Sequence, residues 1–251
     1  MRRGSKEYFM LPTKMSTSLP KLSLCIPTMR RWDFLHRYLP DYLTNPYIGE
    51  IVICDETGED ASRIREAFSD PRVKVHINET RLGAYLNKYK VVSLAENEWV
   101  CLMDSDNFAP ISYFDAWSRF LNGRAPEENE CFLPSRALPN FNYTQFTGIP
   151  TTAENFKDMW KKPGSDAAFN TGNYILSKSA YMKAVTTPDL LKYESECHAL
   201  DVQFRNYFLL MNGAIFHFVP GMEYSHVIHD GSYYLATCSI INRRPFDSLF
   251  E

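Results

Sequence analysis

The chain has 251 residues, of which 45% are hydrophobic and 23% are charged, and this predicts one large globular domain with a sizeable core. A formal net charge of −3 argues against a nucleic-acid partner, since such binding depends on neutralising phosphates. No apolar run approaches the ~18 residues of a membrane span and the amino terminus has no signal-peptide core, so we expect a soluble, cytoplasmic protein with no membrane span.

Strand-like and helix-like segments alternate between residues 21 and 110, whereas residues 1–20 are polar and predict a flexible segment. Buried-looking strands are predicted at 22–26, 50–54, 73–77 and 99–103. Helices are predicted at 34–43, 64–68 and 82–94, and Pro40 should kink or split the first. This alternation favours an α/β fold with a mostly parallel central sheet flanked by helices.

Each predicted strand of this half ends in polar residues. Because ligands bind at the carboxyl ends of parallel strands, we expect these ends to form a site. The four ends are Pro27-Thr28-Met29-Arg30, Asp55-Glu56-Thr57, Asn78 to Arg81, and Asp104-Ser105-Asp106.

The second half has a less regular pattern. Residues 126–166 predict a loop-rich region with exposed aromatic side chains. A strand near residue 175, helices at 181–185 and 200–211 and a strand at 214–219 follow. The aromatic residues of the loop-rich region are Phe141, Tyr143, Phe146 and Trp160.

Asp104 and Asp106 are the strongest candidates for metal ligands. Two carboxylates at positions i and i+2 after a buried strand can point the same way and offer the oxygen ligands that Mg²⁺ or Mn²⁺ prefers. Acidic triplets are also common in solvated turns, which is the alternative. The position at the edge of a predicted α/β sheet favours the metal site.

Several segments, in order and spacing, resemble the family 2 glycosyltransferases, which share the GT-A fold. The resemblance extends from about residue 21 to about residue 234. It rests on residues 23–28, 50–57, 78–87 and 102–106, with weaker matches at 171–173 and 199–201.

The resemblance implies a donor-binding half at 21–110 and an acceptor-binding, catalytic half at 111–251 of one domain. It places a nucleotide-sugar donor on Asp104, Ser105 and residues of the other strand ends, with Asp106 as the main ligand of Mn²⁺ (or Mg²⁺). For Asp55 a helix or turn cap is the alternative, and for Arg81 a surface salt bridge. The other implied donor residues are Pro27, Thr28, Arg30, Gly172 and Asn173.

Inverting members of the family use a carboxylate to deprotonate the acceptor hydroxyl, which implies Asp201 at the start of an apolar helix. The alternative is an ordinary carboxylate of a first helical turn. The family often has two adjacent acids here, but Leu200 precedes Asp201, so Glu194 and Glu196 remain as substitutes.

A late histidine completes the metal shell in some members, and His226 and His229 are both available, with His229 slightly favoured. A structural role is the alternative for each histidine. Trp160 and Tyr233 could stack on sugars or simply pack in the core.

The resemblance therefore predicts a metal-dependent, inverting glycosyltransferase that adds one sugar, from a donor expected on family grounds to carry UDP, to a glycan or glycoconjugate hydroxyl. The Gln-x-x-Arg-Trp motif of processive synthases is absent from the sequence. A sugar-nucleotide nucleotidyltransferase fits less well, because residues 27–30 contain no glycine. A non-catalytic carbohydrate-binding or scaffold domain, and a retaining reaction, remain open alternatives.

Overall fold

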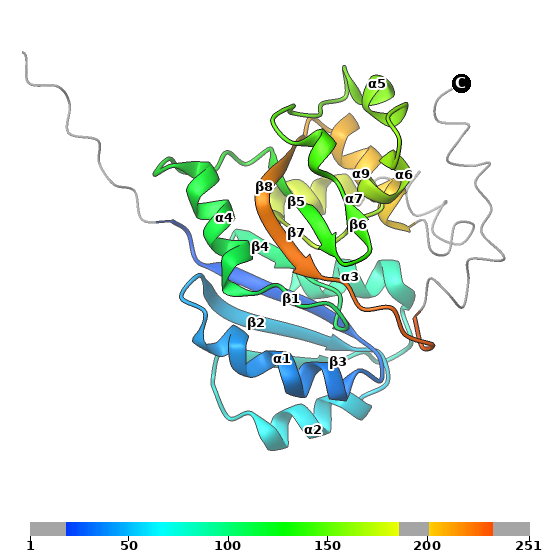
Figure 1. Cartoon of the computed structure of the whole chain (residues 1–251). Helices are drawn as coiled ribbons and strands as arrows, with labels where there is room; N and C mark the ends of the chain where they lie inside the picture. The colour runs from blue at the N-terminus through cyan, green and yellow to red at the C-terminus, as the bar shows by residue number, and fades with distance from the viewer. Residues whose placement is uncertain (1–18, 186–200, 233–251) are drawn as a thin grey trace, which may run out of the picture.

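The computed structural model describes residues 19–185 and 201–232, and of Asp201 only the backbone. In its first part, strands and helices alternate strictly (Figure 1). They are β1 (Leu22–Thr28), α1 (Trp32–Thr44), β2 (Ile48–Asp55), α2 (Glu59–Ala67), β3 (Val73–Ile77), α3 (Gly83–Ser93) and β4 (Trp99–Leu102).

The second part mixes short helices with strands of both directions. It contains α4 (Ile111–Leu121), β5 (Glu130–Leu138), β6 (Phe141–Asn142), a 3₁₀ helix (Thr144–Phe146), α5 (Phe156–Trp160), α6 (Ser165–Ala168), β7 (Tyr174–Ser177), α7 (Lys178–Val185), α9 (Asp201–Met211) and β8 (Ile215–Ser225).

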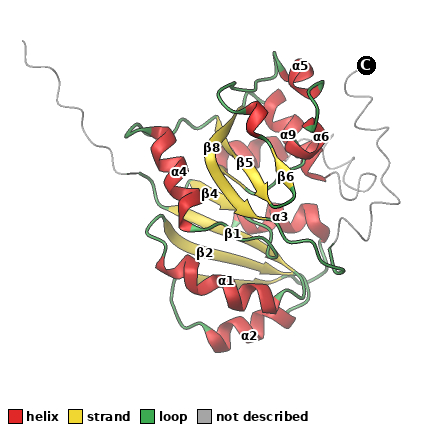
Figure 2. Cartoon of the chain, viewed as in Figure 1, coloured by secondary structure: helices red, strands yellow, loops and turns green. Residues whose placement is uncertain are grey.

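The described strands form one sheet in the order β3-β2-β1-β4-β7-β5-β6, and β8 pairs with β5. Strands β3, β2, β1 and β4 are parallel, β7 is antiparallel to both of its neighbours, and β8 is parallel to β5. Helices α3, α7 and α9 pack together behind the sheet in the view of Figure 2, and α1 and α4 lie in front of it. The predicted α/β class with a mostly parallel sheet is confirmed.

The middle of each central strand is apolar because helices cover both faces of the sheet. Leu22, Leu24 and Cys25 of β1 are fully buried, as are the four residues 51–54 of β2. None of the described helices is long and apolar enough to cross a membrane.

Of the two expected effects of Pro40, a kink or a split, the split is wrong, because α1 runs unbroken through Pro40. Leu35, Tyr38, Leu39 and Tyr42 recur at helical spacing and are buried against the sheet, whereas Pro40 is exposed. The backbone carbonyl that loses its hydrogen bond to Pro40 therefore lies on the face toward solvent, and packing on the other face keeps the helix whole.

Three further expectations for the elements are wrong. Helix α2 begins at Glu59, five residues before the predicted start, after Gly58 adopts a left-handed φ of 78°. Helix α4 lies where no helix was predicted. Strand β5 occupies the first part of the region expected to be loops, and Tyr143 and Phe146 of that region are buried rather than exposed.

The parallel register brings the polar strand ends to one edge, as predicted. Thr28 pairs with Asp55, and Asp55 pairs with Ile77 on the next strand. The backbone N–H of Met103 donates to Cys25 of β1 at 3.0 Å, so Asp104 leaves β4 beside the end of β1.

Candidate functional site

The Asp104–Asp106 loop follows β4 and is held by the chain that follows β8. Within the loop, the backbone N–H of Asn107 donates to the carbonyl of Asp104 at 3.0 Å. Phe108 and Ser225 exchange two backbone hydrogen bonds of 3.0 and 2.8 Å, and the N–H of Val227 donates to Oδ1 of Asn107 at 3.2 Å. Residues more than one hundred positions apart in the sequence therefore fix this loop.

Asp104 is oriented by Asn173. The Asp104 backbone N–H donates to Oδ1 of Asn173 at 2.7 Å, and Nδ2 of Asn173 donates to Oδ2 of Asp104 at 3.1 Å. Asn173 is itself buried, and its carbonyl accepts from the hydroxyl of Tyr113 at 2.9 Å. The other carboxylate oxygen of Asp104 lies 3.6 Å from Nζ of Lys88 on α3. Asn173 thus fixes the first acid of the triplet, and its predicted contact with the donor is untested.

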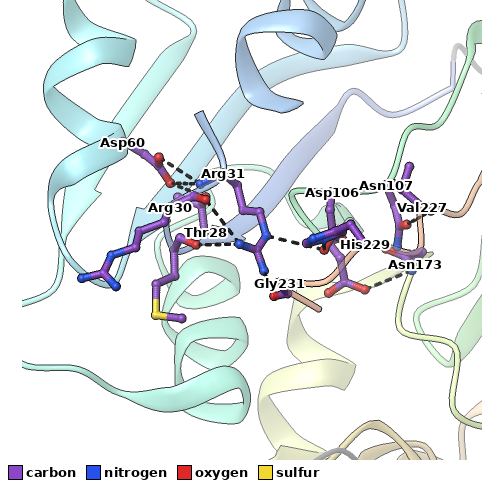
Figure 3. A network of polar contacts seen from close by, with 12 residues as sticks. Thr28, Arg30, Arg31, Asp60, Asp106, Asn107, Asn173, Val227, His229 and Gly231 are labelled. Carbon is purple, nitrogen blue, oxygen red and sulfur yellow. Dashed lines mark hydrogen bonds and ion pairs between the residues drawn. The ribbon is translucent and has the colours of Figure 1, made fainter. Parts of the chain in front are cut away.

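Asp106 meets two side chains from distant parts of the chain (Figure 3). Its Oδ2 lies 2.9 Å from Nε2 of His229 and 3.6 Å from Nε of Arg31. An ionised carboxylate only accepts hydrogen bonds, so Nε2 of His229 carries the proton of this contact. The side chains of Asp106 and His229 are 20% and 21% exposed, which leaves the pair accessible to a small ligand.

Arg31, not the predicted Arg30, points into this site. The Arg30 side chain is 66% exposed, pairs with Glu59 at 2.8 Å and points away from Asp106 in Figure 3. Arg30 has a φ of 57°, which is uncommon outside glycine, and this turn separates the directions of the two arginines. The backbone N–H of Arg31 donates to both oxygens of Asp60 at 3.0 and 2.9 Å. Nothing in the sequence marks Arg30 for a positive φ, so Arg31 was missed.

Thr28 ends β1 with its hydroxyl already bonded. It donates to Oδ2 of Asp60 at 2.7 Å, and the residue is only 2% exposed. Pro27 precedes it in the strand and is half-buried, and Ser105 between the two acids of the triplet is buried. These three predicted donor residues therefore lie at the site edge, and the Thr28 hydroxyl holds the turn that carries Arg31.

His226 lies beside the triplet, but its ring contacts Asn140 rather than a carboxylate of the triplet. Nδ2 of Asn140 donates to the backbone carbonyl of His226 at 3.0 Å, which identifies that atom as the amide nitrogen. The same nitrogen lies 2.8 Å from Nδ1 of His226, so Nδ1 accepts and Nε2 carries the proton. Burial lowers the pKa of His226 despite the opposing charges of Asp104 and Asp106, which favours the neutral ring. Of the two candidate histidines, His229 is the one in contact with a triplet carboxylate.

The carboxylate of Asp55 is fully buried and caps backbone groups. Its Oδ1 accepts from the N–H of Thr57 at 3.0 Å and its Oδ2 from the N–H of Ala61 in α2 at 2.8 Å. This geometry corresponds to the cap alternative for Asp55, and contact with a base remains untested.

The neighbouring Glu56 was not predicted as a site residue. Its Oε2 accepts from the N–H of Leu82 at 2.7 Å, and its buried Oε1 has no partner among the described residues. Burial raises the pKa of Glu56, and the Leu82 and Gly83 N–H groups and the exposed Arg81 act in the opposite direction. Glu56 therefore holds the start of α3 against the end of β2.

Gly172 allows close packing of α9. A Cβ at this position would lie 3.2 Å from Cγ2 of Val202, so the glycine lets α9 pack closely here. The sequence analysis instead suggested that this glycine lets a sugar come close to the backbone. Asn206 of α9 donates to the carbonyls of Phe169 and Thr171 at 2.9 and 3.1 Å. The start of α9, and with it the backbone of Asp201, is thereby joined to the segment that orients Asp104.

Other candidates lie outside the described residues or away from the site. Glu194, Glu196, Tyr233 and the side chain of Asp201 are outside the described part of the chain. Trp160 packs against the core, with ring centroids 5.8 Å from Phe156 and 6.0 Å from Phe169, as the packing alternative predicted.

The carboxylate and imidazole at the triplet could bind a divalent cation that keeps some of its coordination positions open for other ligands. Within residues 19–185 and 201–232 no group of three or more His, Cys, Asp and Glu side chains is arranged to hold a metal. The Asp106–His229 contact offers one carboxylate and one imidazole, and a cation could take the place of the proton they share. Mn²⁺ or Mg²⁺ bound there would keep other positions for phosphate oxygens and water.

A family model described as "Glycosyl transferase family 2" matches residues 23–174, more than half of the chain and including the triplet and Asn173. The chain belongs to glycosyl transferase family 2. The family predicted from the sequence is thus confirmed. A search of curated proteins finds no match to this chain.

Solved structures share the fold. The crystal structure of *S. aureus* TarS 1-349 in complex with UDP-GlcNAc has a TM-score of 0.62 and 14% identity, and the match covers 86% of this chain and 61% of TarS 1-349. The mannosyltransferase PcManGT from *Pyrobaculum calidifontis* in complex with GDP-Man and Mn2+ has a TM-score of 0.59 and 14% identity, with 92% and 63% covered. The chain spans less than two thirds of either protein. At this identity the likeness shows the fold alone, and the expected GT-A fold is confirmed.

Proposed function

We propose that this chain transfers one sugar from a nucleoside diphosphate sugar to a hydroxyl of a glycan or glycoconjugate acceptor. The observation that carries the proposal is the Asp106–His229 pair at the end of β4, inside a family 2 fold. A carboxylate and an imidazole at the carboxyl edge of a parallel sheet, accessible but held by distant segments, suit a bound diphosphate and its cation.

Asp106 and His229 would hold Mn²⁺ or Mg²⁺, and Asp104 would lie at the ribose or the metal. The cation supplies compensation for the negative charge that develops on the departing nucleoside diphosphate. The protein contributes the position of the two acids, through Asn173 for Asp104 and through the backbone bonds of Asn107 and Phe108 for the loop.

The nucleoside would lie at the ends of β1 and β2. Asp55 would accept from an N–H of the base, as the family resemblance implies, in addition to the N–H groups of Thr57 and Ala61 that its two oxygens already bind. Thr28 would support the edge through its bond to Asp60. Pro27 and Ser105 would border the nucleoside and ribose.

Asp201 would remove the proton of the acceptor hydroxyl, with inversion at the sugar carbon. Support comes from the backbone: α9 begins at Asp201 and packs through Val202 onto Gly172, one residue from the asparagine that orients Asp104. A general base on the acceptor side fits an in-line attack opposite the diphosphate. The anomeric configuration of the product, followed by NMR from the start of the reaction, tests inversion against retention.

The nucleotide is the least constrained part of the donor. UDP is the expectation from the family, TarS carries UDP-GlcNAc or UDP in its solved complexes, and PcManGT carries GDP-Man. Each of these complexes is a property of that protein, so both nucleotides belong in the first test of this chain.

Calorimetric titration with UDP, GDP, dTDP and CMP, each with Mn²⁺ or with EDTA, tests the proposal. We expect one nucleotide to bind more tightly with Mn²⁺, and its sugar conjugate then becomes the donor for assays of transfer. Absence of binding by all four under both conditions would overturn the proposal. Binding of a nucleotide with no transfer from any of its sugar conjugates would favour a non-catalytic binding domain.

A further inference from the structure

Each acid of the triplet faces one cationic side chain. Nε of Arg31 lies 3.6 Å from Oδ2 of Asp106, and Nζ of Lys88 lies 3.6 Å from Oδ1 of Asp104. The side chains of Arg31 and Lys88 are only 16% and 10% exposed, so these charges act in a partly desolvated place. The two carboxylates are thereby balanced by the protein itself.

The guanidinium of Arg31 is held in place from several sides. It donates to the carbonyl of Gly231 through Nη2 at 2.5 Å and to those of Met29 and Arg30 through Nη1 at 3.3 Å. The turn that contains Gly231 also carries His229, and Figure 3 shows both lying around Asp106 with Arg31. Arg31 therefore connects the end of β1 to the turn that supplies the second metal-ligand candidate.

A fixed guanidinium at this place has opposite effects on a metal ion and on a diphosphate. Its positive charge disfavours a divalent cation on Asp106 when the cation arrives alone. It favours a diphosphate, because guanidinium groups form charge-assisted hydrogen bonds with phosphate oxygens. A diphosphate would also attract the cation, so the two ligands should bind better together than separately.

We propose that Arg31 is a donor-binding residue that keeps Asp106 neutralised in the free protein and contacts the diphosphate from this same position when donor and cation bind together. Asp106 and His229 would then hold the cation. This inference rests on the proposed function and adds to it an origin for coupled binding of metal and nucleotide. Lys88 plays the parallel role at Asp104.

The test uses Arg31→Gln with Arg65→Gln as the matched control, since Arg65 is an exposed arginine of α2 whose Nη2 donates to the carbonyl of Val75 at 2.9 Å. Mn²⁺ binding to the nucleotide-free protein is measured by electron paramagnetic resonance. Binding of UDP and GDP is measured by calorimetry in EDTA and in Mn²⁺. Loss of one charge-assisted contact corresponds to roughly a tenfold change in a binding constant.

Arg31→Gln is expected to bind Mn²⁺ alone about three- to tenfold more tightly and the nucleotide about tenfold more weakly. Arg65→Gln should leave both constants unchanged. A change of both constants in the same direction, or of neither, would overturn the inference, because a structural role alone does not move them in opposite directions. If the parent binds no nucleotide at all, the proposed function fails first.

Arg31→Lys covers the case in which Arg31→Gln does not fold, as judged by thermal unfolding. Lysine keeps the charge but not the planar fork, so Mn²⁺ alone should still bind as weakly as it does to the parent, while the nucleotide loses part of its affinity. Tighter Mn²⁺ binding by Arg31→Lys would contradict the proposed role of the charge.

Discussion

Clusters of acids, amides and cations lie at both ends of the parallel strands. The two clusters differ in how many close hydrogen-bond and ion-pair partners their carboxylates have. At the amino end, Glu50 of β2 accepts from Ser23, from Lys74 at 2.8 Å and from the backbone N–H groups of Glu96 and Asn97 at 2.6 and 3.2 Å. Its side chain is 5% exposed. Every neighbour of this carboxylate is close, and no room is left for a ligand.

At the carboxyl end the ion pairs with arginine and lysine are longer and the acids are more exposed. The side chains of Asp104 and Asp106 are 34% and 20% exposed, and each meets its cation at 3.6 Å rather than at a close hydrogen-bond distance. The same residue types therefore stabilise the fold at one end of the strands and stay accessible to a ligand at the other end. Substitutions at the amino end should cost stability, and those at the carboxyl end should cost ligand binding.

The largest effect is expected from Asp201→Asn. A general base contributes typically about 10²- to 10⁴-fold to a rate, and asparagine cannot accept the acceptor proton. Turnover should fall by about that factor while nucleotide affinity stays within about twofold of the parent. Steady-state kinetics with the donor identified by titration provides the measurement. Unchanged turnover would return the role to Glu194 or Glu196, or to no base at all.

Glu50→Gln should act on stability alone. The variant keeps the size of the side chain but removes the charge that Lys74 and the backbone N–H groups bind, and we expect a loss of about 2 kcal/mol in the free energy of unfolding. Urea unfolding gives the loss, and calorimetry gives nucleotide affinity. A variant that is as stable as the parent but binds nucleotide poorly would reverse the assignment of the two ends.

Gly172→Ala tests the connection between α9 and the segment that orients Asp104. The added methyl would lie 3.2 Å from Val202, so either the helix or the segment must shift. We expect this shift to lower the free energy of unfolding by about 1 kcal/mol and to lower turnover several-fold. Gly123→Ala is the matched control, because that glycine has a φ of 79° but open space around it. The control should lose stability and keep its turnover, and equal loss of turnover in both would remove the argument for α9.

The smallest effect is a pH dependence of stability at the amino end. Burial alone would raise the pKa of Glu50, but hydrogen bonds from Lys74, Ser23 and backbone N–H groups outweigh it and lower the pKa. The ionised form therefore stabilises the fold above the unfolded-state pKa of about 4.3, and this contribution is lost as the pH falls through the lower folded value. Unfolding free energies measured between pH 3 and 7 should fall less steeply below pH 5 in Glu50→Gln than in the parent. Identical slopes would contradict this account.

The sequence predicted the parallel half because β1, β2 and β4 contain short apolar runs that are buried, and β3 alternates between apolar and polar residues. It did not predict β5, since Pro134 lies inside that strand and argues against one. The structure accommodates Pro134 next to a register shift between β5 and β8. Helix α4 does carry a helical signal, in the spacing of Tyr113, Phe114, Trp117 and Leu121, that was not used.

For the site, the triplet could be found from residue type and its position after a buried strand, and the late histidines from the resemblance to the family. Which of two neighbouring residues faces the site could not be predicted in this way. Arg31 rather than Arg30 meets Asp106 because of a positive φ at Arg30, and the carboxylate of Asp55 binds the backbone N–H groups of Thr57 and Ala61 because α2 begins at Glu59. Such choices depend on local backbone geometry that the residue types do not encode.

The most direct measurement is the position of Mn²⁺ in a crystal of the protein grown with Mn²⁺ and the nucleotide that binds. Anomalous scattering locates the ion independently of the surrounding model. The account predicts a peak about 2–2.3 Å from a carboxylate oxygen of Asp106 and from Nε2 of His229, with phosphate oxygens completing the shell. A peak at Glu50 and Glu96 on the opposite end of the sheet, or a bound nucleotide with no ion near Asp106, would contradict it.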